Sequence, residues 1–398
     1  MGRLEDMGVS RGIFLKAAFG SLAFVLLFLH SFIDQFFVTL EGSVAVTAYT
    51  LDLPIYWIII GICSAFGMVA ALGVKRRMES GDVEGAGGFA LTALVYSVLI
   101  GLCVQAIMVS FSSYYIEPLQ DEDVLQDAVD FLLPFWYLFF GIAFNSVLAS
   151  LLSIDGGQRR LILCLVVSLV TNCVLDPVFV NVMHMGIFGN GLGTAVSLLV
   201  SFLLGLEWFL SRRGTIRLTL KGFDFGLSGL LMSLQAIRHF FVRGFVKNIC
   251  ELIMRMAVFT THALSYGIPL LCTTLAYMLC TGVTPALGAE YNRLYGERDV
   301  DGARRLLTGS AITMLLSMSL FSAVVFILAD PIAHIFTLNP SLTEKHSVIV
   351  GTLRILIFSV PFYGMKFVGR AALAPRGNTT SSTIAAVVWC ILRLALFL

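Results

Sequence analysis

The chain has 398 residues, of which 58% are hydrophobic and 13% charged, and its mean hydropathy is +0.91. A composition this apolar excludes soluble domains and is typical of proteins that cross a membrane many times. The net charge of +1, without a basic tail or patch, gives no reason to expect nucleic acid as a partner. We therefore predict an all-α, polytopic, multi-pass protein of the plasma (cytoplasmic) membrane, in contact with membrane lipid.

The eight cysteines lie scattered within apolar segments and show no CxxC or Cys/His spacing. We expect them to be small apolar residues with free thiols and not metal ligands. The N-terminal stretch MGRLEDMGVSRGIFLK leads into a long apolar run without a small-residue cleavage site. We therefore expect an uncleaved first helix and not a signal peptide.

Apolar runs of about 20 residues are long enough to cross a bilayer as helices, and the sequence predicts eleven such runs. Six lie in the first half, near 12–40, 52–73, 88–111, 130–153, 160–182 and 186–210. Five lie in the second half, near 237–263, 266–289, 308–330, 347–370 and 380–398. We predict an amino-terminal six-helix lobe (1–215), a cytoplasmic linker (216–236) and a carboxy-terminal lobe (237–398).

Clusters of Lys and Arg fall in alternate loops, and such clusters mark the cytoplasmic side. They comprise Lys75, Arg76 and Arg77; Arg159 and Arg160; the stretch from Arg212 to Lys221; Arg293, Arg298, Arg304 and Arg305; and Arg370 and Arg376. The loops between them hold no such clusters, and the one with sequence EPLQDEDVLQD is acidic. We therefore predict a cytoplasmic N-terminus.

An internal repeat relates the two halves. Gly67, Ala71, Leu72, Gly73 and Gly81 recur 215 residues later as Gly282, Ala286, Leu287, Gly288 and Gly296. DVEGA (82–86) is followed later by DVDGA (299–303), and the loop around Gly157 is echoed around Gly377. Because all three echoes fall at predicted cytoplasmic ends, the halves share an orientation and form a parallel repeat.

The repeat leaves one helix without a counterpart. The partner of the sixth span, GIFGNGLGTAVSLLVSFLLGLEWFL, would begin beyond Leu398. We therefore expect six plus five visible transmembrane helices, with the twelfth missing. Either the carboxy-terminal lobe is truncated or the protein works with eleven helices.

Polar side chains inside the apolar spans are the candidate functional residues, because a carboxylate in mid-membrane is energetically costly. Asn172 and Asp176 lie four residues apart and therefore on one helix face. Pro177 removes a backbone donor directly after them and is expected to bend the helix. Asp34 lies in the first span, with His30 one turn before it. We expect the two helices to face each other across one polar cavity.

Three stretches together resemble the multidrug and toxic compound extrusion (MATE) family of cation-coupled efflux transporters, within the wider MOP flippase superfamily. They are SLAFVLLFLHSFIDQFFVTLEG; LASLLSIDGGQRR followed by TNCVLDPVFV; and GIFGNGLGTAVS. The second is the most specific, because it contains Asn, three residues, then Asp-Pro. The resemblance implies a MATE-like pair of helical lobes whose cavities open alternately to either side.

The resemblance also implies a cation or proton coupling site. Asp34, Asn172, Asp176 and Thr194 match positions of the family's amino-terminal Na⁺ or H⁺ site. Carboxylate, amide and hydroxyl oxygens suit a hard cation such as Na⁺, held above all by Asp34 and Asp176, and carboxylates in a partly dry cavity can also exchange protons. No other cofactor is expected.

Structural roles are the alternative for each of these residues. Asp176 could accept hydrogen bonds in a satisfied network, and Asn172 and Thr194 could join helices by hydrogen bonds. His30 could be a packed histidine as readily as a proton relay. Glu251, the main carboxylate of the second half, resembles a cation-binding Glu of some relatives, but Arg255 and Lys247 lie one turn away and could neutralise it.

The sequence also departs from the family pattern. The first helix lacks the usual bending proline, and Gly20 is its only soft point. A tyrosine common in relatives is replaced near Phe131, and the tenth span carries Arg354 and no Asp. These departures leave open the identity of the coupling ion and any ion site in the second lobe.

The leading functional hypothesis is a secondary active antiporter that exports amphipathic or cationic organic compounds (drugs, toxins) in exchange for Na⁺ or H⁺ by alternating access. We expect a monomer that takes small organic substrates. The alternatives are a lipid-linked saccharide flippase of the same superfamily and an inactive truncated copy. An enzyme is not expected, because no HExxH, Ser/His/Asp set or phosphate-binding Gly loop is present.

Overall fold

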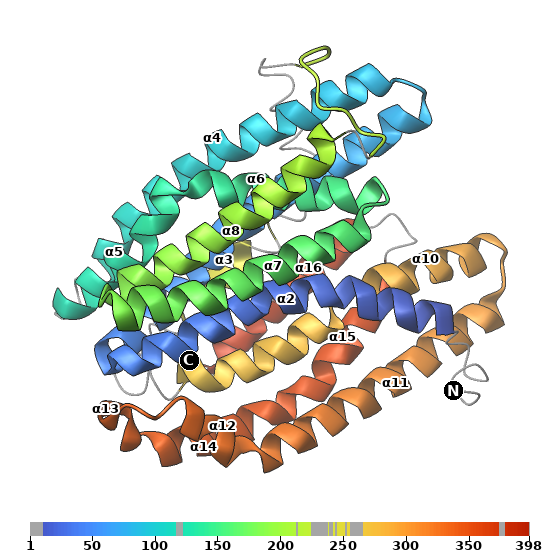
Figure 1. Cartoon of the computed structure of the whole chain (residues 1–398). Helices are drawn as coiled ribbons and strands as arrows, with labels where there is room; N and C mark the ends of the chain where they lie inside the picture. Colours follow the sequence, from blue (N-terminus) through green and yellow to red (C-terminus); the bar gives the residue numbers. More distant parts are fainter. Residues whose placement is uncertain are drawn as a thin grey trace. The chain divides into compact units, whose positions relative to one another are not determined.

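The computed structural model describes residues 11–116, 122–211, 214–223, 238, 242, 245–250, 253–254, 266–373 and 379–397. All regular elements within these ranges are helical (Figure 1). The helices of the first part are α2 (Arg11–Glu41), α3 (Ser43–Glu79), α4 (Val83–Ile116), α5 (Glu122–Tyr137), α6 (Phe139–Ile154), α7 (Gln158–Pro177) and α8 (Gly186–Leu210). After a helix over 266–280 follow α10 (Val283–Gly296), α11 (Val300–Ile327), α12 (Ala329–Ile335), α13 (Pro340–Thr343), α14 (His346–Leu356), α15 (Val360–Leu373) and α16 (Thr379–Phe397).

In the part of the chain that the structure describes, eight helical stretches are long and apolar enough to cross a membrane. Their outward faces carry large exposed hydrophobic side chains, as lipid-facing surfaces do. The predicted all-α, polytopic membrane class is confirmed. The predicted span near 237–263, with Glu251 and Arg255, lies largely outside the described residues.

Several predicted spans are interrupted where hydropathy alone gave one continuous helix. The span predicted over 130–153 is two helices, α5 and α6, which meet at a turn at Leu138. The span predicted over 347–370 contains a 3₁₀ turn over Ile357–Ser359, and the one over 266–289 breaks at Thr281 and Gly282. Apolar composition predicts that a segment lies in the membrane. It does not predict where the helix type changes within that segment.

By its contacts the chain divides into two compact units. Unit 1 comprises Met1–Phe32 and Thr261–Val388, and unit 2 comprises Ile33–Thr260 and Trp389–Leu398. The boundary therefore passes through α2, whereas the sequence had suggested lobes of 1–215 and 237–398.

Unit 2 is built around α3, which packs against α4, α5 and α6. Gly67 permits the close approach of α6, because a Cβ there would lie 2.5 Å from Ser150 Oγ and 2.6 Å from the Ser146 carbonyl oxygen. α7 packs along α8, and the Ser168 hydroxyl of α7 donates to the Ser197 carbonyl of α8 at 2.8 Å. This contact fixes the register between the two helices.

Unit 1 contains the helix break at Thr281 and Gly282. A side chain from α2 forms hydrogen bonds with the backbone groups at this break. The Ser21 hydroxyl accepts from Gly282 N at 2.9 Å and donates to the Leu279 carbonyl at 2.7 Å. A Cβ on Gly282 would lie 2.0 Å from the Ala17 carbonyl oxygen, so only glycine admits α2 this closely. Gly20 was predicted as a soft point of α2, but α2 is one uninterrupted helix and Gly20 lies against Gly282.

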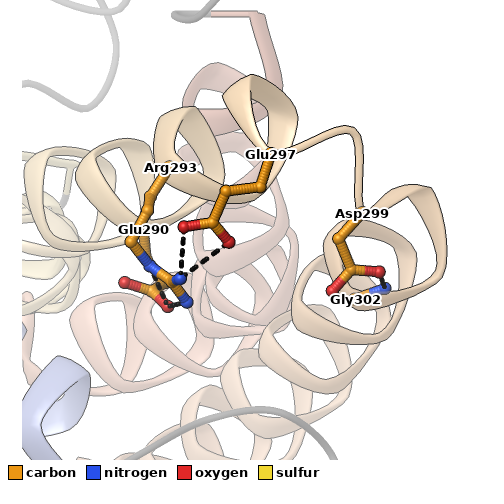
Figure 2. Close-up of polar contacts among 5 residues, drawn as sticks. All are labelled: Glu290, Arg293, Glu297, Asp299 and Gly302. Atoms are coloured by element: carbon orange, nitrogen blue, oxygen red, sulfur yellow. Dashed lines mark hydrogen bonds and ion pairs between the residues drawn. The ribbon is translucent and has the colours of Figure 1, made fainter.

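The turn between α3 and α4 has the same backbone hydrogen bonds as the turn between α10 and α11. In each, the N–H of an aspartate, Asp82 or Asp299, donates to the carbonyl five residues earlier, at 2.9 and 3.0 Å. The Asp82 carboxylate accepts from Gly85 N at 2.9 Å, and the Asp299 carboxylate accepts from Gly302 N at 2.8 Å (Figure 2). DVEGA and DVDGA thus cap α4 and α11 alike.

The register of this repeat differs from the predicted one. Gly81 precedes Asp82 with φ of 82°, and the residue in the same place before Asp299 is Arg298, with φ of 58°. Gly81 therefore corresponds to Arg298 and not to Gly296. Gly156, at φ of 74°, has the equivalent place between α6 and α7. All three turns reverse the chain with one left-handed residue, a conformation that favours glycine.

The end of α10 before this turn carries an ion-pair cluster. Arg293 donates to Glu290 at 2.6 Å and to Glu297 at 2.8 Å (Figure 2). The three side chains lie one turn apart on one face of the helix. Because they are largely exposed, the pairs contribute little to stability.

The start of the predicted linker is held to unit 2. The Asp155 carboxylate, in the turn after α6, accepts from Thr215 N at 2.8 Å and from Trp208 Nε1 at 3.2 Å. Lys221 pairs with Glu84 at 2.9 Å. Residues 214–223 are therefore part of the folded unit.

Candidate functional site

The predicted polar residues of the first half lie together in unit 2. Asp34 is on α2, Asn172 and Asp176 are on α7, and Thr194 is on α8. Asp34 is 2% exposed, and the other three are fully buried. The cluster therefore joins three helices whose contributions are far apart in the sequence.

Asn172 is the centre of the cluster. Its Nδ2 lies 3.2 Å from Asp34 Oδ1, 3.0 Å from Asp176 Oδ1 and 3.2 Å from Thr194 Oγ1. The Thr194 hydroxyl donates to Asp34 Oδ1 at 2.7 Å. One amide group thus bridges the carboxylates of two helices, and Thr194 connects the third.

Asn190, on α8, is a fifth member that the sequence analysis did not identify. It is fully buried, and its Nδ2 lies 3.4 Å from the Asp34 carbonyl oxygen and 3.4 Å from Asp176 Oδ2. It lies one helical turn before Thr194, so the spacing of four was an available signal. The surrounding sequence, GNGLG, indicated instead the glycine-rich start of a helix.

Glycines on α8 make room for the site. A Cβ on Gly193 would lie 2.2 Å from Asp176 Oδ1, and a Cβ on Gly191 would lie 2.4 Å from the Phe131 carbonyl oxygen. The carboxylate of Asp176 therefore lies directly against the α8 backbone. The GxGxG spacing of this entry is explained by close packing on α7 and α5.

The α-helical part of α7 ends at Pro177, the residue after Asp176, and a π-helical turn follows over Val178–Val182. Proline has no N–H, so the carbonyl four residues earlier loses its helical donor. The Met183 N–H then donates to the Val178 carbonyl five residues back, at 2.8 Å. π-helical turns of this kind recur at functional sites, and here one adjoins the buried carboxylate.

The cluster holds two acidic groups, and the side-chain donors that contact them in the described structure, from Asn172, Asn190 and Thr194, are all neutral. Burying carboxylates without a countercharge is costly, so they require protons or a cation. Among the described residues no group of three or more His, Cys, Asp or Glu is placed to hold a metal ion. Two carboxylates with amide and hydroxyl oxygens instead fit a proton or a hard cation that binds reversibly.

Of the two secondary candidates, only His30 lies among the described residues. His30 is buried at 1% exposure in unit 1, with Nδ1 3.1 Å from the Leu26 carbonyl oxygen. Glu251 lies outside the described residues. Phe131, near which the resemblance implies a tyrosine, packs against the ring of Tyr49 with centroids 5.0 Å apart.

Two buried residues of α3 also escaped the sequence analysis. Tyr56 is 5% exposed and lies close enough to Asp34 to interact with its charge. Asp52 is a fully buried carboxylate two residues before Pro54. Like Asp176, Asp52 lies close to a proline in the sequence, and this pattern could have identified it.

Comparison with known proteins gives one consistent family. The sequence profile of the MatE family matches residues 21–178 and 258–397. Multidrug export protein MepA of Staphylococcus aureus (strain NCTC 8325 / PS 47) is 22% identical over 372 residues, which cover 88% of this chain and 77% of MepA.

Solved structures share the fold. One, described as the inward-facing conformation of a multidrug resistance MATE family transporter of the MOP superfamily, superimposes with a TM-score of 0.78 at 19% identity, covering 93% of this chain and 94% of that one. A MOP superfamily transporter from Pyrococcus furiosus Vc1 superimposes with a TM-score of 0.70 at 19% identity, covering 98% of this chain and 99% of that one. The latter is described as having a binding pocket of reversed polarity that suggests a different function.

Proposed function

The chain belongs to the MatE family, and on this premise we propose that it is a secondary active antiporter that exports amphipathic or cationic organic compounds in exchange for Na⁺ or H⁺. The observation that carries the proposal is the buried cluster of Asp34, Asn172, Asp176 and Thr194, in which the side-chain donors to both carboxylates are neutral among the residues that the structure describes. Such a site can take up and release a proton or a cation. The multidrug substrate class comes from the printed name of the relative MepA.

Coupling requires that the ion binds one conformation of the protein more tightly than another. The cluster can supply this difference, because its groups come from α2, α7 and α8. When the carboxylates are neutralised, the three helices can stay close together. When they are charged and empty, mutual repulsion favours their separation. Substrate then binds the state that the ion disfavours.

The proposal is tested by efflux of a fluorescent organic cation from proteoliposomes with an imposed Na⁺ or pH gradient. In the wild type, one of these two gradients is expected to drive export of the organic cation. Asp34→Asn and Asp176→Asn should each abolish gradient-driven transport while the protein stays folded, because the amide can neither bind a proton nor carry the charge. Asp301→Asn, at an exposed position, is the control. Normal gradient-driven efflux by Asp176→Asn would contradict the site, and no efflux by wild type under either gradient would contradict the antiporter.

A further inference from the structure

Arg354 is a charged residue inside a membrane-spanning segment, and the proposed antiport gives it no role. It lies on α14, within the apolar stretch His346–Leu373, and its side chain is exposed. No hydrogen bond or ion pair joins it to another residue within the described ranges. A charged side chain at membrane depth is costly unless it is paired. The unpaired guanidinium therefore indicates an anionic ligand.

The depth of Arg354 in the membrane places its charge within reach of lipid head groups. The stretch His346–Leu373 has 28 residues and is therefore about 42 Å long, which exceeds the hydrocarbon core of about 30 Å. Arg354 follows His346 by eight residues, or about 12 Å of helix. With the stretch centred in the bilayer, its Cα lies about 6 Å below the nearer edge of the hydrocarbon. Helical side chains tilt toward the N-terminus of their helix, which for Arg354 is the direction of that edge.

Aromatic and aliphatic side chains surround the guanidinium on the deeper side. Its Cζ lies 5.3 Å from the centroid of the Phe326 ring of α11, and the Phe326 and Phe358 rings lie 5.8 Å apart. Phe358 is 66% exposed, and Ile355, next to Arg354 in the sequence, is 73% exposed. This part of the surface can therefore contact an apolar chain directly below the charge.

Gly351 leaves the approach to the guanidinium open on the other side. It lies one turn before Arg354 on the same helix face, and a Cβ there would meet nothing within 4 Å. Ser347, one further turn toward the membrane surface, is exposed and carries a hydroxyl that can donate a hydrogen bond. A head group can therefore approach Arg354 along this face without displacing a side chain.

We propose that Arg354 binds the phosphate of an anionic phospholipid, whose acyl chains lie on Ile355 and Phe358. A guanidinium binds phosphate through two parallel N–H donors and stays charged in proteins. A membrane lipid fits this face better than an exported compound does, because the charge lies at head-group depth and the exposed apolar side chains lie below it. The inference does not depend on which ion the transporter uses.

The first measurement is of lipid binding beside Arg354. Ile355→Trp is introduced into a chain whose four native tryptophans are replaced by phenylalanine. The protein is reconstituted into mixtures of dioleoyl phosphatidylglycerol and dioleoyl phosphatidylcholine, one of which is brominated on its acyl chains. Quenching of the introduced tryptophan then reports which lipid lies beside it. Phosphatidylglycerol should be preferred about fivefold, the gain expected from one basic side chain near the membrane surface.

Two pairs of variants isolate the site. Arg354→Gln removes the charge, and its control, Arg293→Gln, removes a charge that is already paired with carboxylates of its own helix. Gly351→Leu fills the open side. Its control, Gly369→Leu, places the same side chain at an exposed glycine of α15 where a Cβ would also meet nothing within 4 Å. The preference for phosphatidylglycerol should disappear in Arg354→Gln and Gly351→Leu and persist in both controls.

The second measurement is native mass spectrometry of bound phosphatidylglycerol, made on the same variants with the native tryptophans in place. Wild type and both controls should retain an additional lipid molecule compared with Arg354→Gln and Gly351→Leu. Equal lipid preference and equal lipid retention in wild type and Arg354→Gln overturn the inference. If Arg354→Gln then also loses efflux in phosphatidylcholine alone, the anion belongs to the exported compound and not to a lipid. Absence of efflux by wild type concerns the antiporter and leaves the lipid site standing.

Discussion

Gly193 determines where the Asp176 carboxylate can lie. Oδ1 of Asp176 occupies the space that any larger residue on α8 would fill, 2.2 Å from the position of a Cβ. This oxygen also accepts from Asn172. A single methyl group at Gly193 would therefore displace the acid from the amide that joins it to Asp34.

We predict that Gly193→Ala abolishes gradient-driven transport and lowers Tm. Glycine to alanine within a helix normally stabilises by up to about 1 kcal/mol, so destabilisation here would identify the steric conflict. The control is Gly61→Ala on α3, where a Cβ meets nothing within 4 Å. Full transport by Gly193→Ala would show that the carboxylate is not held against the backbone.

At the same scale, the sequence could predict Asp34, Asn172, Asp176 and Thr194 as neighbours, and the structure brings these four together. Their role as a coupling site stays a prediction. Asn190 could not be predicted with equal ease, because Asn beside glycines is typical of turns. Only the tertiary packing brings its Nδ2 to the Asp34 carbonyl of α2 and to Asp176 Oδ2 of α7.

Among the elements, the broken helix of unit 1 depends on one hydroxyl. Ser21 satisfies the Gly282 N–H and the Leu279 carbonyl, the groups that the break leaves without helical partners. In lipid no water replaces a lost partner. The break is therefore stable only as long as α2 supplies this side chain.

We predict that Ser21→Ala destabilises the protein by about 1–3 kcal/mol, the cost of leaving buried backbone groups unpaired. The measurement is Tm in detergent at one heating rate. Ser317→Ala is the control, because the exposed Ser317 hydroxyl donates within its own helix, to the Met314 carbonyl. Equal Tm values for the two variants would contradict the assignment.

Arg298 offers a test of the turn between α10 and α11. Its φ of 58° is unfavourable for a residue with a Cβ. We predict that Arg298→Gly raises stability by up to about 1 kcal/mol, whereas Gly81→Ala, at the equivalent turn with φ of 82°, lowers it. If both substitutions raised Tm, or both lowered it, the two turns would not correspond.

The elements show why hydropathy predicts spans but not their breaks. The runs over 12–40 and 186–210 match α2 and α8 closely. Hydropathy does not predict the break at Thr281, because the side chain that satisfies its backbone groups, that of Ser21, lies 258 residues away from Leu279 in the sequence. Local composition carries no information about such a partner.

For the whole molecule, the alternation of basic loops predicts the orientation in the membrane. Arg293 and Arg298 lie at the end of α11 that we assign to the cytoplasm, and Ser341 lies beyond its other end. In a cysteine-free background, a membrane-impermeant thiol reagent should label Ser341→Cys in intact cells and Glu297→Cys only after lysis. The reverse pattern would invert the assignment for the entire chain.

The division of α2 between the two units has a consequence for biosynthesis. Arg11–Phe32 belongs with Thr261–Val388, so the ribosome completes Ile33–Thr260 before it makes the partners of the first half of α2. At about 5–20 residues per second, this takes roughly 10–50 s. During that interval Ser21 and Gly20 lack their partners Leu279 and Gly282, while the half of α2 that carries Asp34 can already pack on α7 and α8. The buried acid cluster can thus assemble before the residues that close the helix break have been made.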